Sequence, residues 1–356
     1  FTFTELGVSD IRWGQALLSV VHDVYQLPGY LELEAERMLG RPAAALVTWA
    51  KGWLLVPYVV RDVGIEPGAE DLSSPYGYAG YLVSEGSSGS QLRGAFTVLV
   101  GNLARLGYCS LFLRLHPYLN SELVGFPIGV VHRTGETVNV DLAQPLDTLL
   151  GEVNNAKRRR AAHLASDGYE ASFVPYREGL EDFHQTYLDT MRRVDATSEY
   201  FSFTLAYFQR LAGVLGDRLI VGVVRRDGVV ISTLLVAASC GIAHTLFSGT
   251  YSVAMSHHPS VLLTIEAIKW CKQRGYKVLH LGGGLGGHHD SLFQFKSEFS
   301  KGRLPFRTIR LVLDSARYER LAYKRARELG LDEPGRLDPS FFPTYRSPDP
   351  DVAVVG

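Results

Sequence analysis

The sequence is poor in cysteine, which argues against two classes of protein. Its three cysteines, Cys109, Cys240 and Cys271, form no CxxC pair and match no zinc-site pattern. Neither a disulfide framework nor a bound metal is indicated. We therefore expect a reducing, cytoplasmic setting, no metal and no cofactor.

Long apolar segments are absent as well. No window approaches the ~18 uninterrupted apolar residues that a membrane-spanning helix needs. The first 21 residues, FTFTELGVSDIRWGQALLSVV, contain no basic segment followed by an apolar one. We expect no membrane span and no signal peptide.

The length and composition indicate a globular protein with two domains. The chain has 356 residues, of which 46% are hydrophobic and 21% charged. Single hydrophobic cores stop growing at roughly 250 to 300 residues, so two cores are expected.

The net charge of −1 is the sum of an acidic first half and a basic second half. Residues 1–150 hold 9 Lys+Arg and 15 Asp+Glu, whereas residues 151–356 hold 27 and 22, which gives about −6 and +5. The basic half is consistent with contact to phosphate, and solvated surface charge is the alternative explanation.

Hydrophobic periodicity and turn residues predict the order of elements. The first half contains a hairpin at 44–60, a helix at 88–107 and a strand at 109–115. A strand at 137–143 and a helix at 145–167 follow. The second half contains a short strand after Gly168, helices at 178–193 and 203–215, an antiparallel meander at 218–250, a helix at 260–275 and a strand ending in the glycines 282–284. A short helix with Lys296, a strand at 306–314 and a helix at 316–328 come last.

A meander, a crossover helix and a strand running into glycines is the order of a GNAT acyltransferase core, and the first half repeats it coarsely. We therefore predict an α/β fold of two tandem GNAT-like domains, each a mixed, mostly antiparallel sheet with flanking helices, around a shared cleft. The predicted domains are 1–150 on the acceptor side and 151–330 on the donor side, followed by an extended tail at 331–356.

Several separated motifs carry a resemblance to a known family. TMRRVDATSEYFSFTLAYFQRL, GTYSVAMSHHPSVLLTIEAIKWCKQRGYKVLHLGGG and DSLFQFKSEF resemble the Fem-type, BioF2-like branch of the GNAT superfamily, and the similarity runs from DVYQLPGY to FFPTYR. The resemblance implies transfer of an aminoacyl group from aminoacyl-tRNA to an amine. Some members act on cell-wall precursors and others tailor natural products. This chain lacks the long helical hairpin of some cell-wall members, which favours a small-molecule acceptor.

The resemblance also assigns a catalytic cation. Phe295 and Lys296 match a Phe-Lys pair of the Fem-type pattern, and the ammonium would stabilise the tetrahedral oxyanion or hold a terminal phosphate. On spacing alone, a lysine on such a helix is usually just solvated. No GxSxG motif is present, and the cysteines lie in apolar settings, so a covalent nucleophile is not indicated.

The glycines 282–284 end a strand, where backbone without side chains can approach a ligand closely, although a plain flexible loop has the same sequence. His288, His289 and Asp290 follow. Either histidine has the right intrinsic pKa to take a proton from the amine, and polar surface is the alternative.

The donor is predicted from an absent signature and a basic run. A GNAT enzyme that binds CoA presents R/Q-x-x-G-x-G/A before the crossover helix, whereas this chain reads GTYSVAMSHHPSV. Lys157, Arg158, Arg159 and Arg160 are candidates for contacting RNA phosphates, although four consecutive residues cannot share one helix face. The remaining substrate-binding candidates are Tyr76, Tyr78, Arg193, Tyr200, Tyr207 and Tyr251, for each of which simple packing is the alternative.

The sequence therefore predicts an aminoacyltransferase that forms an amide between an amino acid from aminoacyl-tRNA and a small-molecule amine, in the biosynthesis of a natural product such as an antibiotic. No membrane and no DNA are expected as partners. An N-acyltransferase that uses acyl-CoA or an acyl carrier is the first alternative, and a peptidoglycan-precursor aminoacyltransferase is the second. A catalytically inactive binding module with the same fold remains a third.

Overall fold

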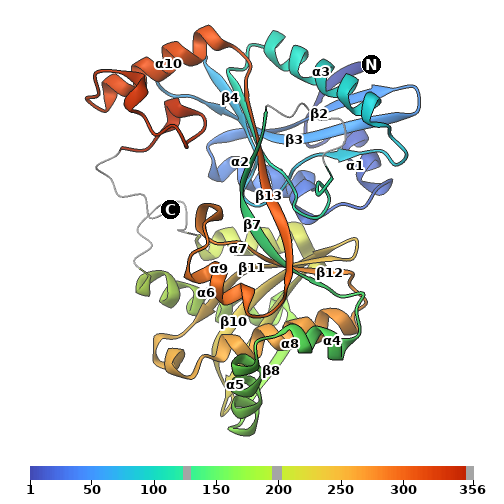
Figure 1. Ribbon diagram of the computed structural model, residues 1–356, viewed down its shortest axis with the longest axis vertical. Helices are drawn as coiled ribbons and strands as arrows, with labels where there is room; N and C mark the ends of the chain where they lie inside the picture. The colour runs from blue at the N-terminus through green and yellow to red at the C-terminus, as the bar shows by residue number, and fades with distance from the viewer. Residues whose placement is uncertain (123–129, 195–202, 350–356) are drawn as a thin grey trace. The chain divides into compact units, whose positions relative to one another are not determined.

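The computed structural model describes residues 1–122, 130–194 and 203–349 (Figure 1). The chain divides into two compact units. Unit 1 comprises the described residues of Phe1–Thr134 and Pro305–Val354, and unit 2 comprises those of Gly135–Leu304. This division differs from the predicted boundaries near residues 150 and 330, because the segment that follows Leu304 returns to unit 1.

Unit 1 is built on a mixed sheet. Its strands lie in the order β1 (Thr2–Leu6), β2 (Gly40–Trp49), β3 (Gly52–Asp62), β4 (Glu70–Ser73), β6 (Ser110–Arg114) and β13 (Gly302–Val312), with β5 (Leu82–Val83) beside β3. β2 and β3 are antiparallel from Gly40 with Arg61 to Trp49 with Gly52, which confirms the predicted hairpin. β4 and β6 are parallel, so the chain between them must cross over the sheet.

The crossover in unit 1 is helix α3 (Gly89–Arg105). Ser88 begins it with a capping box, in which the Ser88 and Gln91 side chains each accept a backbone N–H of the other residue. Its apolar face, including Leu92, Phe96 and Leu99, packs on alternate residues of β2 and β3. The helices α1 (Ile11–Leu18) and α2 (Pro28–Arg37) complete this unit, and α2 packs on β2 and β3.

The tail after helix α10 (Ser315–Glu328) is anchored to unit 1 by one buried carboxylate. Asp71 on β4 is fully buried and accepts hydrogen bonds from Arg61 Nε (2.9 Å), Arg346 Nε (2.6 Å) and the Tyr345 hydroxyl (3.2 Å). Tyr345 also bonds Ser110 Oγ at 2.7 Å. The described tail contains only the 3₁₀ turns η7 (Pro334–Arg336) and η8 (Thr344–Arg346), so tertiary bonds rather than local structure hold it.

Unit 2 is built on a second mixed sheet. Its strands lie in the order β8 (Tyr169–Pro175), β9 (Leu219–Arg226), β10 (Val229–Ser239), β11 (Ile242–Thr250), β12 (Val278–Gly282) and β7 (Val131–Asp141). β9, β10 and β11 form the predicted antiparallel meander. β11 and β12 are parallel, and helix α8 (Pro259–Gln273) crosses between them.

Helices pack on both faces of the unit 2 sheet, which explains the unbroken apolar run of β10. Leu234, Val236 and Ala238 point to α8 and α5 (Asn155–Ser166), where they share one hydrophobic cluster. From the opposite face of β10, the Thr233 hydroxyl bonds Thr186 of α6 (Tyr176–Arg193). Helix α7 (Leu205–Leu215) packs on α6.

The predicted helix 145–167 is two helices, α4 (Leu146–Glu152) and α5. The chain turns at Val153 and Asn154, and Asn154 Oδ1 caps α5 by accepting the Ala156 N–H at 2.8 Å. Asn154 N also donates to the carbonyl of Glu298 at 2.7 Å. The Asn154 side chain starts a new helix at Asn155 because it satisfies one of the free N–H groups of α5, although the surrounding residues follow a helical pattern.

The two units repeat one order of elements, as predicted for tandem GNAT-like domains. A meander (β2, β3 and β4, or β9, β10 and β11) leads to a helix (α3 or α8) and then to a parallel strand (β6 or β12). In each unit, the strand next to the parallel strand comes from a part of the sequence adjacent to the other unit. β7 follows β6 in sequence but pairs with β12, and β13 follows β12 but pairs with β6.

None of the helices in the described part of the chain is long and apolar enough to cross a membrane.

His184 on α6 is expected to make the stability of unit 2 depend on pH. It is buried beside the Phe208 ring, and neither ring nitrogen has a hydrogen-bond partner among the described residues. Burial lowers its pKa below 6.5, so the unfolded chain binds the proton more readily than the native one. Stability should therefore fall as the pH falls through about 6.5, where the unfolded histidine begins to protonate.

Urea unfolding of wild type and His184→Leu at pH 8 and pH 5.5 checks this. The variant should gain stability relative to wild type on acidification. An equal difference at both pH values would contradict the assignment.

Candidate functional site at the end of β12

The candidate site begins where β11 and β12 separate. The two strands pair only from Ile242 with Val278 to His244 with His280. Beyond that, Thr245 Oγ1 donates to the carbonyl of Leu281 at 3.3 Å, and no further ladder bonds join the strands. A side chain of β11 therefore binds the carbonyl of Leu281, and the β11–β12 ladder itself ends at His244 and His280.

Glycines form this end of β12 for steric reasons. Gly282 has φ of +81°, a conformation that residues with a Cβ avoid. A Cβ on Gly283 would lie 2.8 Å from the carbonyl oxygen of Glu136, and one on Gly284 would overlap the carbonyl of His288 and the carboxylate of Asp290. The three predicted glycines thus let two backbone segments lie against the strand end.

Gly284→Ala should therefore displace the loop that follows β12. We expect a loss of about 1–3 kcal/mol in unfolding free energy from the forced shift, with a lower turnover. Gly151→Ala is the matched control, since a Cβ there meets nothing within 4 Å. Unfolding and rate measurements that cannot distinguish the two variants would contradict the steric reading.

Lys296 on α9 (Ser291–Ser297) reaches back to this strand end. Its Nζ donates to the carbonyl of Gly283 at 2.6 Å, and the side chain is half-buried. Burial lowers the pKa of Lys296 to about 8, although the nearby Asp290 charge acts in the opposite direction. An ammonium has three N–H bonds, so the one to Gly283 leaves two for a substrate oxygen.

Asp290, one of the predicted catalytic residues, holds the loop together through two backbone hydrogen bonds. Its Oδ1 accepts the Phe293 N–H at 2.8 Å and caps α9, while Oδ2 accepts the Leu285 N–H at 2.9 Å. The carboxylate therefore fixes the start of the helix that carries Lys296. This geometry gives Asp290 a positioning role.

The other two predicted catalytic residues have contacts within unit 2. Phe295 packs edge-to-face on Phe299 with ring centroids 5.0 Å apart, and Lys157 Nζ lies 5.3 Å from the centre of the Phe295 ring. His289 is exposed, stacks on Phe293 at 4.2 Å and has Nε2 3.6 Å from a Glu136 carboxylate oxygen. His289 thus lies at the surface of the same loop.

A pair of buried histidines was missed by the sequence analysis. His244 on β11 and His280 on β12 are cross-strand neighbours, and their Nδ1 atoms lie 3.0 Å apart. Since one Nδ1 must donate to the other, two neutral rings would be opposite tautomers. The available signal was a histidine inside the apolar strand VLHLG.

The loop before α8 uses its own amides. Ala254 N donates to Tyr251 O (2.9 Å), His258 N to Met255 O (3.0 Å) and Val261 N to His258 O (3.1 Å), while Pro259 has no N–H. A helix N-terminus binds pyrophosphate through free backbone N–H groups. The amides of Ala254, His258 and Val261 are thus engaged within the protein, in the segment that lacks the pyrophosphate signature.

Three predicted substrate-binding residues of unit 2 have structural contacts. Arg193 Nη1 donates to the carbonyl of Thr250 at 3.0 Å, next to the half-buried Tyr251, whose pKa is raised by burial and by the Asp182 and Asp189 charges. Tyr207 is buried in an aromatic cluster with Phe203, Phe208 and neighbours. Tyr200 lies outside the described residues.

The two tyrosines predicted in unit 1 lie near a buried acid–histidine pair. The carbonyl of Tyr76 accepts from the Tyr30 hydroxyl at 3.0 Å, and the Tyr78 ring contacts those of Tyr25 and Phe306. Tyr25 also contacts the ring of His116 at 6.5 Å.

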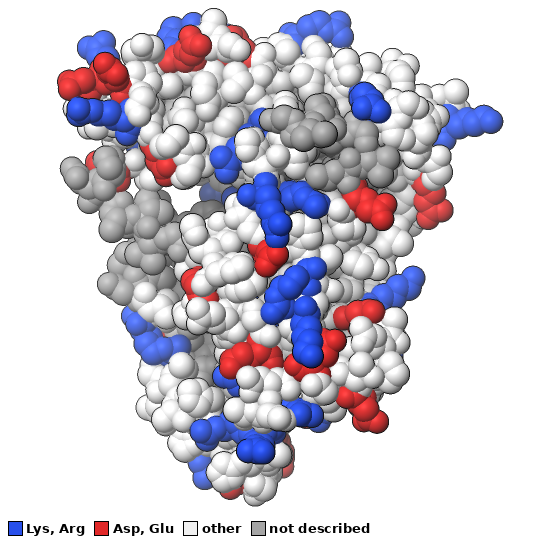
Figure 2. Space-filling view, viewed as in Figure 1, with Lys and Arg blue, Asp and Glu red and all other residues white. Residues whose placement is uncertain are grey.

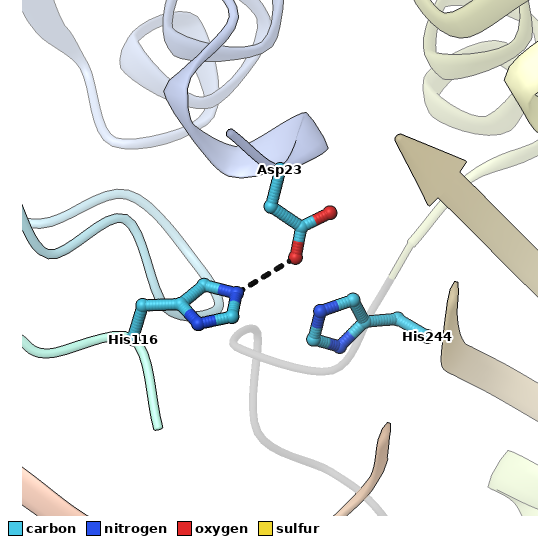
Figure 3. A group of neighbouring side chains, drawn as sticks. All are labelled: Asp23, His116 and His244. Atoms are coloured by element: carbon cyan, nitrogen blue, oxygen red, sulfur yellow. Dashed lines mark hydrogen bonds and ion pairs between the residues drawn. The ribbon is translucent and has the colours of Figure 1, made fainter. Parts of the chain in front are cut away.

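His116 is buried and bonds the buried Asp23 (Figure 3). Its Nε2 lies 2.8 Å from Asp23 Oδ2, and its Nδ1 accepts the N–H groups of Tyr118 and Leu119. Because Nδ1 accepts, the proton of the neutral ring lies on Nε2 and points to the carboxylate. This bond joins the loop after β6 to the segment before α2.

Comparisons with known proteins agree with this geometry. Residues 153–296 match the family model for the acetyltransferase (GNAT) domain. This segment is similar to that domain. It contains the meander, α8, the glycine end of β12 and Lys296. A comparison with curated protein sequences gives no match.

Solved structures extend the likeness to most of the chain. The crystal structure of FemX is similar with a TM-score of 0.68 and 11% identity, over 90% of this chain and 99% of that one. The C-terminal domain of a putative lysylphosphatidylglycerol synthetase from Agrobacterium fabrum gives 0.53 and 13%, over 88% and 94%. L-PGS from Bacillus licheniformis gives 0.52 and 11%, over 87% and 93%. The predicted Fem-type resemblance is therefore confirmed in the fold, and an acyltransferase function is supported by the GNAT domain.

Proposed function

We propose that the protein is an aminoacyltransferase that joins an amino acid from aminoacyl-tRNA to the amine of a small molecule in natural-product biosynthesis. One observation carries the proposal. The segment that matches the GNAT model holds the half-buried ammonium of Lys296 at the carboxyl end of β12, where it forms no ion pair with a carboxylate that the structure describes. The Fem-type fold supports an aminoacyl rather than an acetyl donor.

In the proposed reaction, the neutral amine attacks the ester carbonyl carbon of the donor. A C–N bond forms, the carbonyl oxygen becomes an oxyanion, and the Lys296 ammonium stabilises it. The C–O bond to the ribose then breaks, the ribose oxygen takes a proton and the amine nitrogen loses one. Holding the reactants together supplies much of the rate enhancement, about 7–11 kcal/mol in favourable cases.

The loop before α8 favours this donor over a CoA thioester. A CoA pyrophosphate needs free amides at the start of the crossover helix, and the amides of Ala254, His258 and Val261 bond within the loop. An aminoacyl ester of RNA needs no such cradle.

Measurements of ligand binding distinguish an aminoacyl-tRNA donor from a CoA thioester donor. Filter retention of bulk aminoacylated tRNA is compared with calorimetry with acetyl-CoA at one moderate salt concentration. We expect retention and no heat with CoA. Heat with CoA, no retention and product formation insensitive to ribonuclease would replace the proposal with an N-acyltransferase. If the protein transferred the amino acid to a peptidoglycan precursor and not to small amines, the proposed donor would stand and the proposed acceptor would be replaced.

A further inference from the structure

Helix α5 carries a concentrated positive charge near its N-terminus. Lys157, Arg158, Arg159 and Arg160 occupy positions three to six of the helix, and its first turn has no acidic residue. The three arginines are exposed, and none forms an ion pair with a described carboxylate. Arg158 bonds only the neutral side chain of Asn155. Figure 2 shows Lys and Arg side chains gathered at the lower end of the molecule, where Figure 1 places α5.

This arrangement costs local stability. The N-terminal end of a helix is the positive end of its dipole, and a cation in the first turn is unfavourable there. Neighbouring like charges add to that cost. The three exposed guanidinium groups make this part of α5 an attractor for phosphate, which guanidinium binds with two parallel hydrogen bonds.

The same end of α5 is attached to the helix that carries Lys296. Asn154 N donates to the carbonyl of Glu298 at 2.7 Å, and Lys157 Nζ lies 2.9 Å from the Glu298 carboxylate. Lys157 also lies over the ring of Phe295, the residue before Lys296. Lys157 is therefore engaged within the protein, unlike the three arginines that follow it.

We propose that Arg158, Arg159 and Arg160 form a docking surface for the sugar–phosphate backbone of the acceptor stem of the RNA donor. This proposal rests on the proposed function and adds where the RNA binds. The arginines hold the stem, and Lys157 positions α5 against α9, so the RNA is held beside the helix whose lysine meets the ester. Phosphate contacts carry no sequence information, so the surface accepts charged tRNA regardless of stem sequence.

The test compares the variant R158Q/R159Q/R160Q with the control R177Q/R218Q/K277Q, which removes three exposed charges from other parts of unit 2. Each phosphate contact contributes about 0.7–0.9 to the slope of log affinity against log salt. Three consecutive residues of a helix do not all face one stem, so the α5 variant should lose about 1 to 2 from that slope and raise KM for charged tRNA without changing kcat. The control should behave as wild type.

A second donor substrate, which has no acceptor stem, tests whether the effect of the α5 variant depends on the stem. With an aminoacylated trinucleotide that carries the same 3′ end and no stem, the α5 variant should match wild type. Equal losses with the trinucleotide, equal losses in the control, or an unchanged salt slope would each overturn the docking surface. So would loss of binding to phosphatidylglycerol vesicles with intact binding of charged tRNA. Failure of the proposed function is a different result, in which wild type itself transfers nothing from charged tRNA.

Discussion

Replacing Lys296 with alanine is expected to lower turnover by about 10²-fold or more, with a much smaller change in KM. The reason is that removing one positioned donor from an oxyanion costs about 2.7–4 kcal/mol of transition-state stabilisation. Steady-state rates with charged tRNA and an amine panel measure it. Lys301→Ala is the matched control, because Lys301 is an exposed lysine of the turn that follows α9. Unchanged turnover in Lys296→Ala would remove the lysine from the mechanism.

The pH profile gives a second, independent measurement on this residue. The proposed role needs the ammonium form, and the pKa of Lys296 is lowered to about 8 by burial. The rate should therefore fall as the pH rises through about 8, as the lysine loses its proton. In Lys296→Arg, the fall in rate near pH 8 should disappear from the pH range in which the protein can be assayed, because guanidinium stays charged. A limb near pH 8 that persists in the arginine variant belongs to another group.

Replacing Asp71 with alanine is expected to destabilise unit 1 by about 3–5 kcal/mol, the usual cost of removing one partner of a buried ion pair. The variant leaves Arg61 and Arg346 without the carboxylate that both now contact, and it removes an acceptor of Tyr345. Burial already lowers the pKa of Arg61, which shows that its surroundings disfavour a charge. Urea unfolding with the same activity assay measures the effect.

Glu66 supplies the control for Asp71. It contacts Arg320 and Lys324 from α10 and has its pKa lowered to about 2 by those hydrogen bonds, but water reaches the pair. Exposed ion pairs contribute little to stability. Glu66→Ala should therefore change stability far less than Asp71→Ala. A loss in Glu66→Ala as large as that in Asp71→Ala would contradict burial as the cause.

Much of unit 2 follows from local sequence. The meander at 219–250, α8 and β12 are strongly periodic, and turns such as Asp227-Gly228 and Cys240-Gly241 fix where each strand ends. Lys296 and the glycines 282–284 lie within fifteen residues of one another, in two neighbouring motifs of the sequence. In the structure, Lys296 Nζ donates a hydrogen bond to the carbonyl of Gly283, so the two motifs are also in contact.

What the sequence could not supply depends on distant residues. His244 and His280 are 36 positions apart, and only the register of the parallel pair brings them together. The contacts of Asp71 with Tyr345 and Arg346 span about 275 positions. At the break between α4 and α5, Asn154 also bonds the carbonyl of Glu298, the residue after α9, which is 144 positions away. The elements β1, α1 and α2 were not predicted, and the segment before residue 44 received no assignment.

The pairing of β6 with β13 sets an order of events during synthesis. β6 has β4 on one side, and its other side stays an unpaired strand edge until β13 has been made, nearly 200 residues later. Ile309 and Leu311 of β13 belong to the hydrophobic core of unit 1. All of Gly135–Leu304 leaves the ribosome before that core is complete. Unpaired strand edges favour aggregation, so a nascent chain stalled before residue 305 exposes the edge that the finished protein covers.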